Sequence, residues 1–309
     1  MSSSRVMIML AALLAACGMA AGPSGGPGGP DSTGMRPPPD SAASPPVREC
    51  EAPRAGWIWC DDFEEDRLAS YFEVDSAGGA FVRVNGVGVN GSSAMRARFA
   101  AGAVSAGALH LAVGKTPQAY FRPADQGTAI YRELYWRVYV RTEPGWIGGG
   151  GRKLTRAFVF ASPVNWGQAA IAHVWSGAPP NQDYLVLDPA SGTNGAGTLI
   201  ADRYNDFDHL RWLGAVRTTT PVFSSGTAGR WVCIEVHARL NDPGQSNARF
   251  TLWIDGRLAA SKSGFDWQGS FAAYGLNAVY LENYWNEGSP KAQERYFDHF
   301  VVSTARIGC

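Results

Sequence analysis

Strict alternation of polar and apolar residues is the feature of this sequence that most restricts its fold. Over residues 131–141, tyrosine, glutamate and arginine occupy the odd positions, and Leu134, Trp136, Val138 and Val140 occupy even ones, with Arg132 at the edge. Residues 231–240 alternate in the same way. A period of two is typical of a β-strand with one face in the core and one face toward solvent.

The same signal recurs along most of the chain. We expect further strands at 80–84, 94–99, 157–160, 171–175, 184–187, 277–282 and 296–303, and a hairpin over 250–259 that turns at Asp255-Gly256. Glycine and proline separate these runs, and no long amphipathic helix is evident. Many strands in one domain of this size predict an all-β protein, a two-sheet sandwich or jelly roll.

The first residues have the pattern of an export signal. Arg5 precedes an apolar run from Val6 to Leu14, which is too short to span a membrane as a mature helix. The quartet Leu14-Ala15-Ala16-Cys17 resembles the cleavage box of bacterial lipoproteins, which implies that Cys17 becomes a lipid-bearing N-terminus. The alternative is an ordinary secretory signal with a chance cysteine. We expect a membrane-anchored bacterial lipoprotein that faces the periplasm or the cell exterior.

Composition divides the rest of the chain into a tether and a domain. After the signal at 1–17, residues 18–49 are dominated by Gly, Pro, Ser and Ala, which bury too little apolar surface to fold. We interpret them as a disordered tether. Residues 50–309 suit one large β-sandwich domain, which we expect to be a monomer.

Four cysteines remain after Cys17, and an even number in an exported chain predicts disulfides. Three pairings are open. We favour Cys50–Cys60, because these residues enclose a short segment, and Cys233–Cys309, because that bond would pin the last residue to a strand. A zinc site is disfavoured, since no Cys-x-x-Cys spacing occurs.

Charge and motifs exclude several classes of function. The chain carries 27 basic and 27 acidic residues, and this balance argues against nucleic acid as a partner. There is no Gly-x-Ser-x-Gly elbow of a serine hydrolase and no Walker spacing around Gly148–Gly151. The eleven Trp and eleven Tyr suit a surface that stacks on sugar rings, although some must fill the core.

Four local patterns together resemble the concanavalin-A-like jelly rolls of bacterial polysaccharide lyases of the alginate, glucuronan and heparin lyase type. They are residues 59–64 (WCDDFE), residues 135–140 with the loop 148–154 (YWRVYV, GGGGRKL), residues 230–235 with 252–256 (RWVCIE, LWIDG), and residues 296–303 (YFDHFVVS). Lyases of this type carry a Gly-Gly-Lys-Leu-Pro-Gly loop. This chain has an inserted Arg152 before Lys153 and lacks the Pro-Gly, a departure that bears on catalysis more than on fold.

The resemblance implies β-elimination on an acidic, uronate-containing polysaccharide. Such chemistry needs a cation beside the uronate carboxylate and groups that move protons, roles that Arg, Lys, Tyr and His can fill. The candidate catalytic residues are Lys153, Arg137, Tyr139, His173 and Tyr284, and the candidate substrate-binding residues are Tyr131, Tyr135, Arg141, Tyr280 and Trp285. Lys153 matches the loop lysine of the resembling lyases, and the polar face of residues 131–141 is expected to line an open groove.

Simpler interpretations of these residues stay open. Lys153 could be a solvated loop lysine, His173 a structural histidine, and Tyr280 and Tyr284 core aromatics. Arg137 and Tyr139 could form an ordinary polar outer face.

Two other classes of function also remain. A jelly-roll glycoside hydrolase needs paired carboxylates on one strand face, and the only similar pattern is Asp62-Phe63-Glu64-Glu65-Asp66, outside any alternating strand. A non-catalytic carbohydrate-binding or adhesion lipoprotein would use the same aromatic groove. No cofactor is indicated, although Asp61, Asp62 and Asp298 offer oxygen ligands for a structural calcium ion.

The predicted lipid anchor can be tested at Cys17. Cys17→Ser removes the thiol that would carry the lipids, so we expect the variant to leave the membrane fraction when cells are fractionated. A variant that stays membrane-bound in the same yield would contradict the lipoprotein interpretation.

Overall fold

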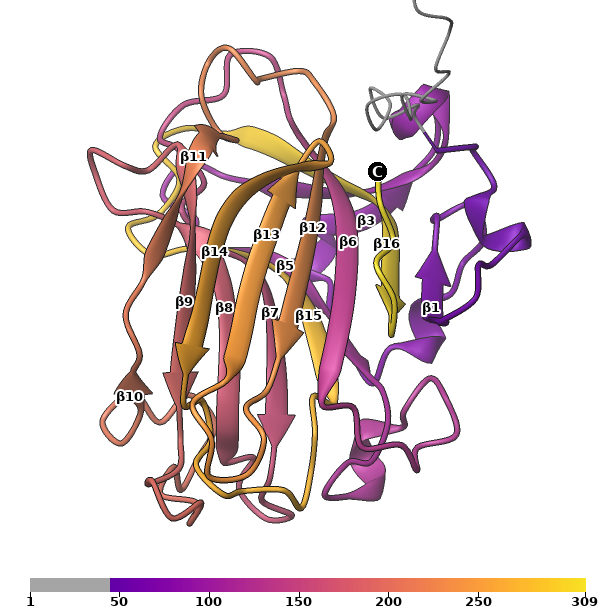
Figure 1. The fold of residues 1–309 in the computed structure, drawn as a ribbon. Coiled ribbons are helices and arrows are strands. Elements are labelled where there is room, and N and C mark those ends of the chain that lie inside the picture. Colours follow the sequence, from indigo (N-terminus) through magenta and orange to yellow (C-terminus); the bar gives the residue numbers. More distant parts are fainter. Residues whose placement is uncertain (1–44) are drawn as a thin grey trace, which may run out of the picture. The chain divides into compact units, whose positions relative to one another are not determined.

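The computed structural model describes residues 45–309. These residues fold into two antiparallel β-sheets that are stacked face to face (Figure 1). The predicted signal, Cys17 and most of the predicted tether lie outside these residues. All of the paired strands run antiparallel, which confirms the all-β prediction. Within residues 45–309, no helix has the length and apolar character needed to cross a membrane.

Each sheet contains eight strands. Sheet A has the order β14 (Arg257–Phe265), β13 (Ala248–Ile254), β12 (Val232–Arg239), β6 (Glu133–Thr142), β16 (Gln293–Ser303), β4 (Ala94–Phe99) and β3 (Phe81–Val84), and β1 (Trp57–Asp61) also pairs with β16. Sheet B has the order β10 (Arg211–Trp212), β9 (Tyr184–Ser191), β8 (Gln168–Ser176), β7 (Arg152–Phe160), β15 (Ala278–Trp285), β5 (Ser105–Ala112) and β2 (Glu73–Asp75), and β11 (Val216–Pro221) pairs with β9. The described helices are single 3₁₀ turns: η1 (Glu49–Glu51), η2 (Leu68–Ser70), η3 (Ala77–Gly79), η4 (Val89–Gly91) and η5 (Ala119–Phe121).

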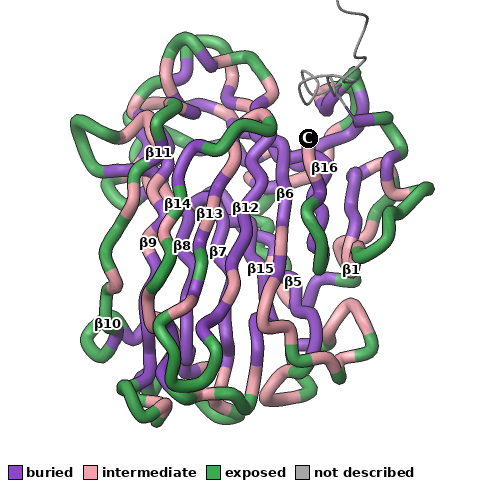
Figure 2. The backbone as a smooth tube through the Cα atoms, in the orientation of Figure 1, coloured by how far each residue is buried: buried purple, intermediate pink, exposed green. Residues whose placement is uncertain are grey.

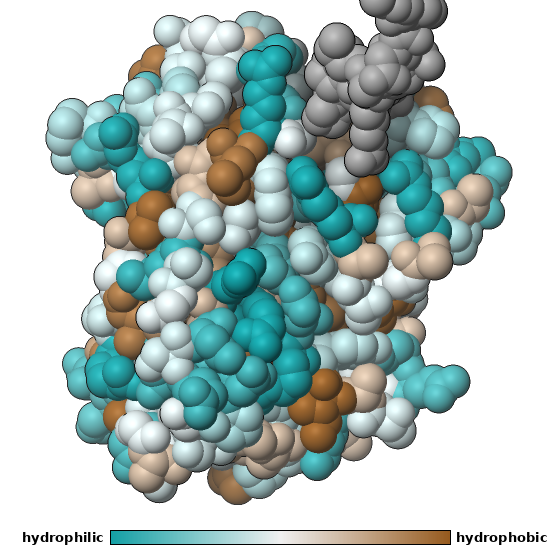
Figure 3. Space-filling model, in the orientation of Figure 1, coloured by the Kyte–Doolittle hydropathy of each residue, from teal (hydrophilic) through white to brown (hydrophobic). Residues whose placement is uncertain are grey.

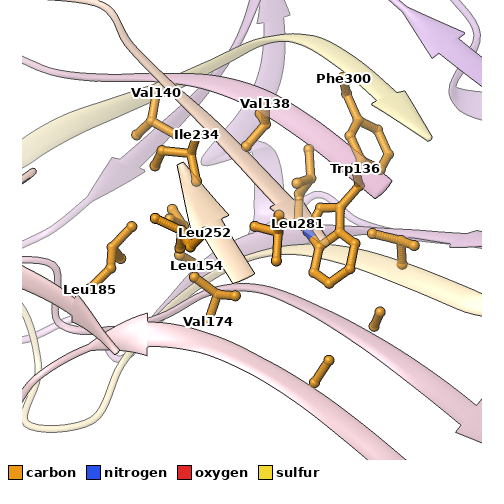
Figure 4. Packing of buried hydrophobic residues seen from close by; sticks show 14 of the residues in the cluster. Trp136, Val138, Val140, Leu154, Val174, Leu185, Ile234, Leu252, Leu281 and Phe300 are labelled. Carbon is orange, nitrogen blue, oxygen red and sulfur yellow. The ribbon is translucent and has the colours of Figure 1, made fainter. Parts of the chain in front are cut away.

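The core lies between the sheets and follows the alternation in the sequence. Trp136, Val138 and Val140 of β6 point inward and meet Leu154, Val174 and Leu281 of sheet B (Figure 4). Trp136 is fully buried, and its indole Nε1 donates a hydrogen bond to Thr155 Oγ1 at 3.1 Å. The central strands are accordingly buried along most of their length (Figure 2).

The strands with clear polar–apolar alternation were predicted from the sequence, whereas those with weak alternation were missed. The predicted hairpin turns at Asp255 and Gly256, whose φ angles of 49° and 75° match the two-residue turn favoured between antiparallel strands. The strands β1, β2, β5, β10 and β11 were not predicted. In β5, alanine and glycine hide the period that Leu109 and Leu111 would otherwise show.

Both predicted disulfides are present. Cys50 and Cys60 are joined with Cα atoms 5.5 Å apart, and Cys233 and Cys309 with Cα atoms 6.0 Å apart, both ordinary spacings for the bond. The second disulfide ties the last residue to β12.

The polar outer face of β6 is covered by both ends of the folded unit. Arg137 is 1% exposed and is held by the Glu49 carboxylate of η1 and, at 3.1 Å, by the carbonyl oxygen of Gly308. The Tyr139 hydroxyl donates to the Cys309 carbonyl oxygen at 2.7 Å. The C-terminus thus lies against sheet A beside β6 and β16 (Figure 1). This face is not the open groove that we expected.

Glu49 has its pKa shifted by this burial and by its partners. Burial alone would raise the pKa of the carboxyl, but His299, whose Nδ1 lies 3.2 Å from Glu49 Oε2, and the charge of Arg137 outweigh it and lower the pKa to about 2. The pair therefore makes its full contribution to the stability of the fold at pH values above the pKa that Glu49 has in the unfolded chain. This contribution is lost as the pH falls toward 2.

Replacing Glu49 should be costly. Glu49→Gln leaves Arg137 charged and buried, so we expect a loss of about 3 kcal/mol or more in the free energy of unfolding at pH 7, measured with denaturant. The loss should shrink as the pH falls from 5 toward 2.

Glu51→Gln is the matched control, because Glu51 pairs with Arg48 on the surface. It should cost well under about 1 kcal/mol. Equal losses for the two variants would show that the Arg137–Glu49 pair does not hold η1 against sheet A.

Candidate functional site

The outer face of sheet B carries a row of polar and aromatic side chains that faces away from sheet A. The row runs from β2 to β9 through residues that pair directly across neighbouring strands: Glu73, His110, Tyr280, Arg156, His173 and Asp188. Figure 3 shows the opposite side of the molecule, the outward side of sheet A, which is also largely hydrophilic. Ionisable groups aligned on one rigid sheet are the usual material of a binding or catalytic site.

Arg156 and Glu282 form the buried centre of the face. Two guanidinium nitrogens of Arg156 bond the two carboxylate oxygens of Glu282, with Nε to Oε2 at 2.5 Å. The loop after β9 closes over the pair, since Tyr204 and Asn205 accept hydrogen bonds from Arg156 at 2.9 Å. Burial raises the pKa of Glu282, but the charge of Arg156 outweighs it and lowers the pKa, so both groups stay charged.

His173 and Tyr280 flank Arg156 and are fully buried. His173 Nδ1 contacts the Asp188 carbonyl oxygen at 3.0 Å, whereas His173 Nε2 and the Tyr280 hydroxyl have no hydrogen-bond partner in the described part of the chain. Burial, and next the charge of Arg156, lower the pKa of His173 well below its ordinary value, so its imidazole is neutral at physiological pH. Tyr280 stacks on His110 with ring centroids 3.7 Å apart.

A β-bulge brings Lys153 onto this face. The register of β7 shifts between Lys153 and Thr155, so that Leu154 and Thr155 both face the core. In a regular strand, residues three positions apart lie on opposite faces. Because of the bulge, Lys153 instead points outward on the same face as Arg156. The register of β15 shifts before Tyr284, and the Lys153 ammonium lies 4.4 Å from the Tyr284 ring centroid. Bulges commonly re-aim side chains next to functional sites.

Lys153 and Tyr284 are accessible members of the face, together with the half-buried Glu73, His110 and Asp188. Tyr284 is 39% exposed, and Lys153 is partly exposed. Burial, and next the charge of Arg156, lower the pKa of Lys153 below 10.5 despite the opposing charge of Glu282. The pair therefore offers a cation and a phenol side by side.

A cleft of about 230 Å³ lies at the end of the face beside this pair. Its walls include Arg152, Trp175, Asp188 and Asn286. Arg152 has a φ of 120°, which is strained for a side chain of its size, and it forms an ion pair with Glu287 at 2.8 Å. Burial raises the pKa of Asp188 to about 6.

The glycine-rich loop 148–151 borders a second hollow of about 240 Å³, which shares Arg152 with the cleft and is lined by Gly148 and Gly151. Gly151 has a φ of 71°, and a Cβ atom there would lie 2.4 Å from the Trp285 ring. The loop therefore needs glycine at this position both for its backbone conformation and for its close approach to Trp285.

The structure separates the predicted catalytic residues into two groups. Lys153, His173 and Tyr284 lie on the outer face of sheet B, whereas Arg137 and Tyr139 lie on the opposite sheet beneath Glu49 and residues 308–309. The five residues do not form one site. The expectation failed because alternation assigns a residue to a strand face but does not show which sheet the strand joins or what covers it.

The predicted binding residues are mostly engaged in packing. Tyr135 stacks on His237 at 4.3 Å, and Arg141 lies between the rings of Trp231 and Tyr296 on sheet A. The hydroxyl of Tyr131, which precedes β6, donates to Asp125 Oδ2 at 2.7 Å. On sheet B, Tyr280 is buried, and Trp285 packs in the core against Phe99 and Trp146.

Possible metal ligands are distributed differently from the expectation. Asp61, Asp62 and Asp298 each accept hydrogen bonds from backbone amides and are not gathered into one cluster. Among residues 45–309, the one group with suitable spacing is Asp202, Asp206 and His209. Arg203 lies 3.2 Å from Asp206 Oδ1 and already balances its charge.

Arg156 and Glu282 were missed in the sequence, although a signal exists. Arg156, Phe158 and Phe160 alternate with core residues along β7, and Tyr280, Glu282 and Tyr284 do so along β15. An arginine and a glutamate at outward positions of central strands could have been expected to pair.

Comparison with known proteins gives a fold and no family. No protein family matches the chain, and no curated protein is detectably similar in sequence. An alginate lyase from Aplysia kurodai superposes with a TM-score of 0.56 at 12% identity, covering 81% of this chain and 100% of that one. An endo-β-1,4-glucuronan lyase from Trichoderma reesei gives 0.53 at 12% identity, covering 81% and 96%.

A Chlorella virus alginate lyase gives a TM-score of 0.52 at 11% identity, covering 77% of this chain and 94% of that one. At such low identity these similarities concern the fold alone. The chain has the jelly-roll-like β-sandwich fold of these polysaccharide lyases.

Proposed function

We propose that the outer face of sheet B binds a uronate-containing polysaccharide and cleaves it by β-elimination. The observation that carries the proposal is the accessible Lys153–Tyr284 pair beside the cleft. The similar solved structures named for alginate and glucuronan lyases support the acidic substrate class. We further propose that Cys17 anchors the protein to a bacterial membrane, where it meets extracellular or periplasmic polymer.

The pair supplies the groups that β-elimination requires. The Lys153 ammonium would neutralise the uronate carboxylate, which makes the adjacent C5–H bond more acidic. The Tyr284 hydroxyl would move protons at the reacting unit. The C5–H bond and the C4–O glycosidic bond break and a C4–C5 double bond forms; the Tyr284 oxygen would take up the C5 proton as its own hydroxyl proton passes to the leaving oxygen.

Arg156, Glu282 and His173 would act as supports. All three are buried, and the bidentate pair fixes the strands on which Lys153 and Tyr284 stand. A neutral His173 also avoids adding a second positive charge beside Arg156.

A non-catalytic carbohydrate-binding or adhesion protein is the second candidate. The same burial favours it, because the closed Arg156–Glu282 pair and the covered His173 leave few free proton-transfer groups at the surface. Such a protein would bind the polymer and release no product.

Turnover and binding can be separated by substitution. Lys153→Ala and Tyr284→Phe should each lower turnover about 10²-fold or more while changing binding far less, because their main effect is in the transition state. Turnover is measured by the ultraviolet absorbance of the unsaturated uronate product on alginate and glucuronan.

Matched controls exist elsewhere in the chain. Lys115 contacts Tyr274 at 5.1 Å, which makes Lys115→Ala the counterpart of Lys153→Ala, and Tyr139→Phe is the counterpart of Tyr284→Phe on the covered sheet. Both should leave turnover unchanged. A wild-type protein that binds the polymer without product would establish the second candidate, and binding of neutral glucans alone would exclude an acidic substrate.

The charge of Lys153 also predicts a pH dependence. Because its pKa is lowered from 10.5, the ammonium loses its proton at a lower pH than an ordinary lysine, so turnover of uronate polymer should fall early in the alkaline range. Lys153→Arg should keep its charge and move the fall to higher pH, as measured by the ultraviolet absorbance of the product across pH. An unchanged profile in this variant would show that Lys153 does not meet the carboxylate.

A further inference from the structure

Aromatic rings form a stack that leads from the buried face to the exposed edge of sheet B. His173 stacks on Trp175 at 4.3 Å, Trp175 on Trp212 at 5.7 Å, and Trp212 on Phe207 at 6.1 Å between ring centroids. The interplanar angles of these three pairs are 21°, 29° and 16°, so the rings are close to parallel.

The outer rings of the stack are open to solvent. Trp212 is 42% exposed and Phe207 is 45% exposed, although rings of this size gain most by burial. Trp212 belongs to β10, a strand of two residues at the sheet edge, and Phe207 to the loop before it. Folding alone does not account for two large rings held parallel and left exposed.

The stack is continuous with the cleft. Trp175 and Asp188 line the cleft, and Trp175 pairs directly with Lys153 across β7 and β8. The side chains from Tyr284 on β15 to Trp212 on β10 therefore cross five neighbouring strands without leaving the outer face. Strands lie about 4.8 Å apart, close to the length of one sugar unit, so a chain lying across them would place about one unit at each strand.

We propose that Trp175, Trp212 and Phe207 form a stacking platform for further sugar units of the polysaccharide held at Lys153 and Tyr284. The apolar C–H face of a pyranose ring matches a flat aromatic ring, and its hydroxyl groups need polar partners at the rim, which Asp188 and Asn286 supply. The occupant is the extended part of the same polymer. This inference rests on the proposed function and adds that affinity depends on chain length.

The test compares long and short ligands. Trp212→Ala should weaken binding of alginate or glucuronan polymer by roughly three- to tenfold, the scale of one aromatic stacking contact. It should leave binding of a uronate disaccharide at Lys153 unchanged. Trp212→Phe keeps a ring and should restore most of the polymer affinity. Binding is measured by calorimetry, with an unchanged melting temperature as the check on folding.

Tyr120→Ala is the matched control, because Tyr120 is 51% exposed and lies away from the cleft, bonded to Glu73 of β2. It should not change polymer affinity. If Trp212→Ala binds polymer and disaccharide as the wild type does, the platform is overturned while the proposed function stands. If the wild type binds no uronate polymer, the proposed function fails and the platform with it.

Discussion

The buried ion pair between Arg137 and Glu49 closes the outer face of sheet A over β6. It holds η1 against the middle of sheet A, where the C-terminal segment and its disulfide to β12 complete the cover. Removing two charges from water is costly, and the cost is offset only when their geometry is good and their remaining hydrogen-bonding capacity is used. Arg137 meets this condition through Glu49 and the Gly308 carbonyl oxygen. The segments around Glu49 and Cys309 therefore cover the outer face of sheet A beside β6, whereas the end of sheet B at Lys153 and Tyr284 stays accessible.

A second buried pair organises that remaining face. Arg156 and Glu282 join β7 to β15, and Tyr204 and Asn205 seal them beneath the loop after β9. Their burial leaves Lys153 and Tyr284, with Arg152, Asp188 and Asn286 of the cleft wall, as the accessible polar groups at this end of the face. The same two strands thus carry a buried ion pair and, at their far ends, an accessible cation and phenol.

Sequence reasoning predicted most of the strands and the core, but its candidate site residues lie on two sheets. The period of two in β6 assigned Trp136 and Val138 to the interior correctly. The same period made Arg137 and Tyr139 look accessible, since it carries no information about Glu49, a residue 88 positions away that covers them. Lys153 was found through a resembling loop, whereas Arg156 was missed because its partner lies 126 positions along the chain. Local periodicity cannot predict which distant segment covers a strand face or which distant residue pairs with a side chain on it.

The bulge in β7 explains how an altered loop can still present its lysine. Compared with the resembling lyase loop, this chain has Arg152 inserted before Lys153, and an added residue in a strand reverses the face of everything beyond it. Here Leu154 and Thr155 both face the core, so the bulge compensates for the one added residue. Lys153 therefore lies on the outer face. The strained φ of Arg152 and its ion pair with Glu287 fix the inserted side chain at the cleft wall. The insertion therefore adds a second cation beside Lys153 and does not displace the first.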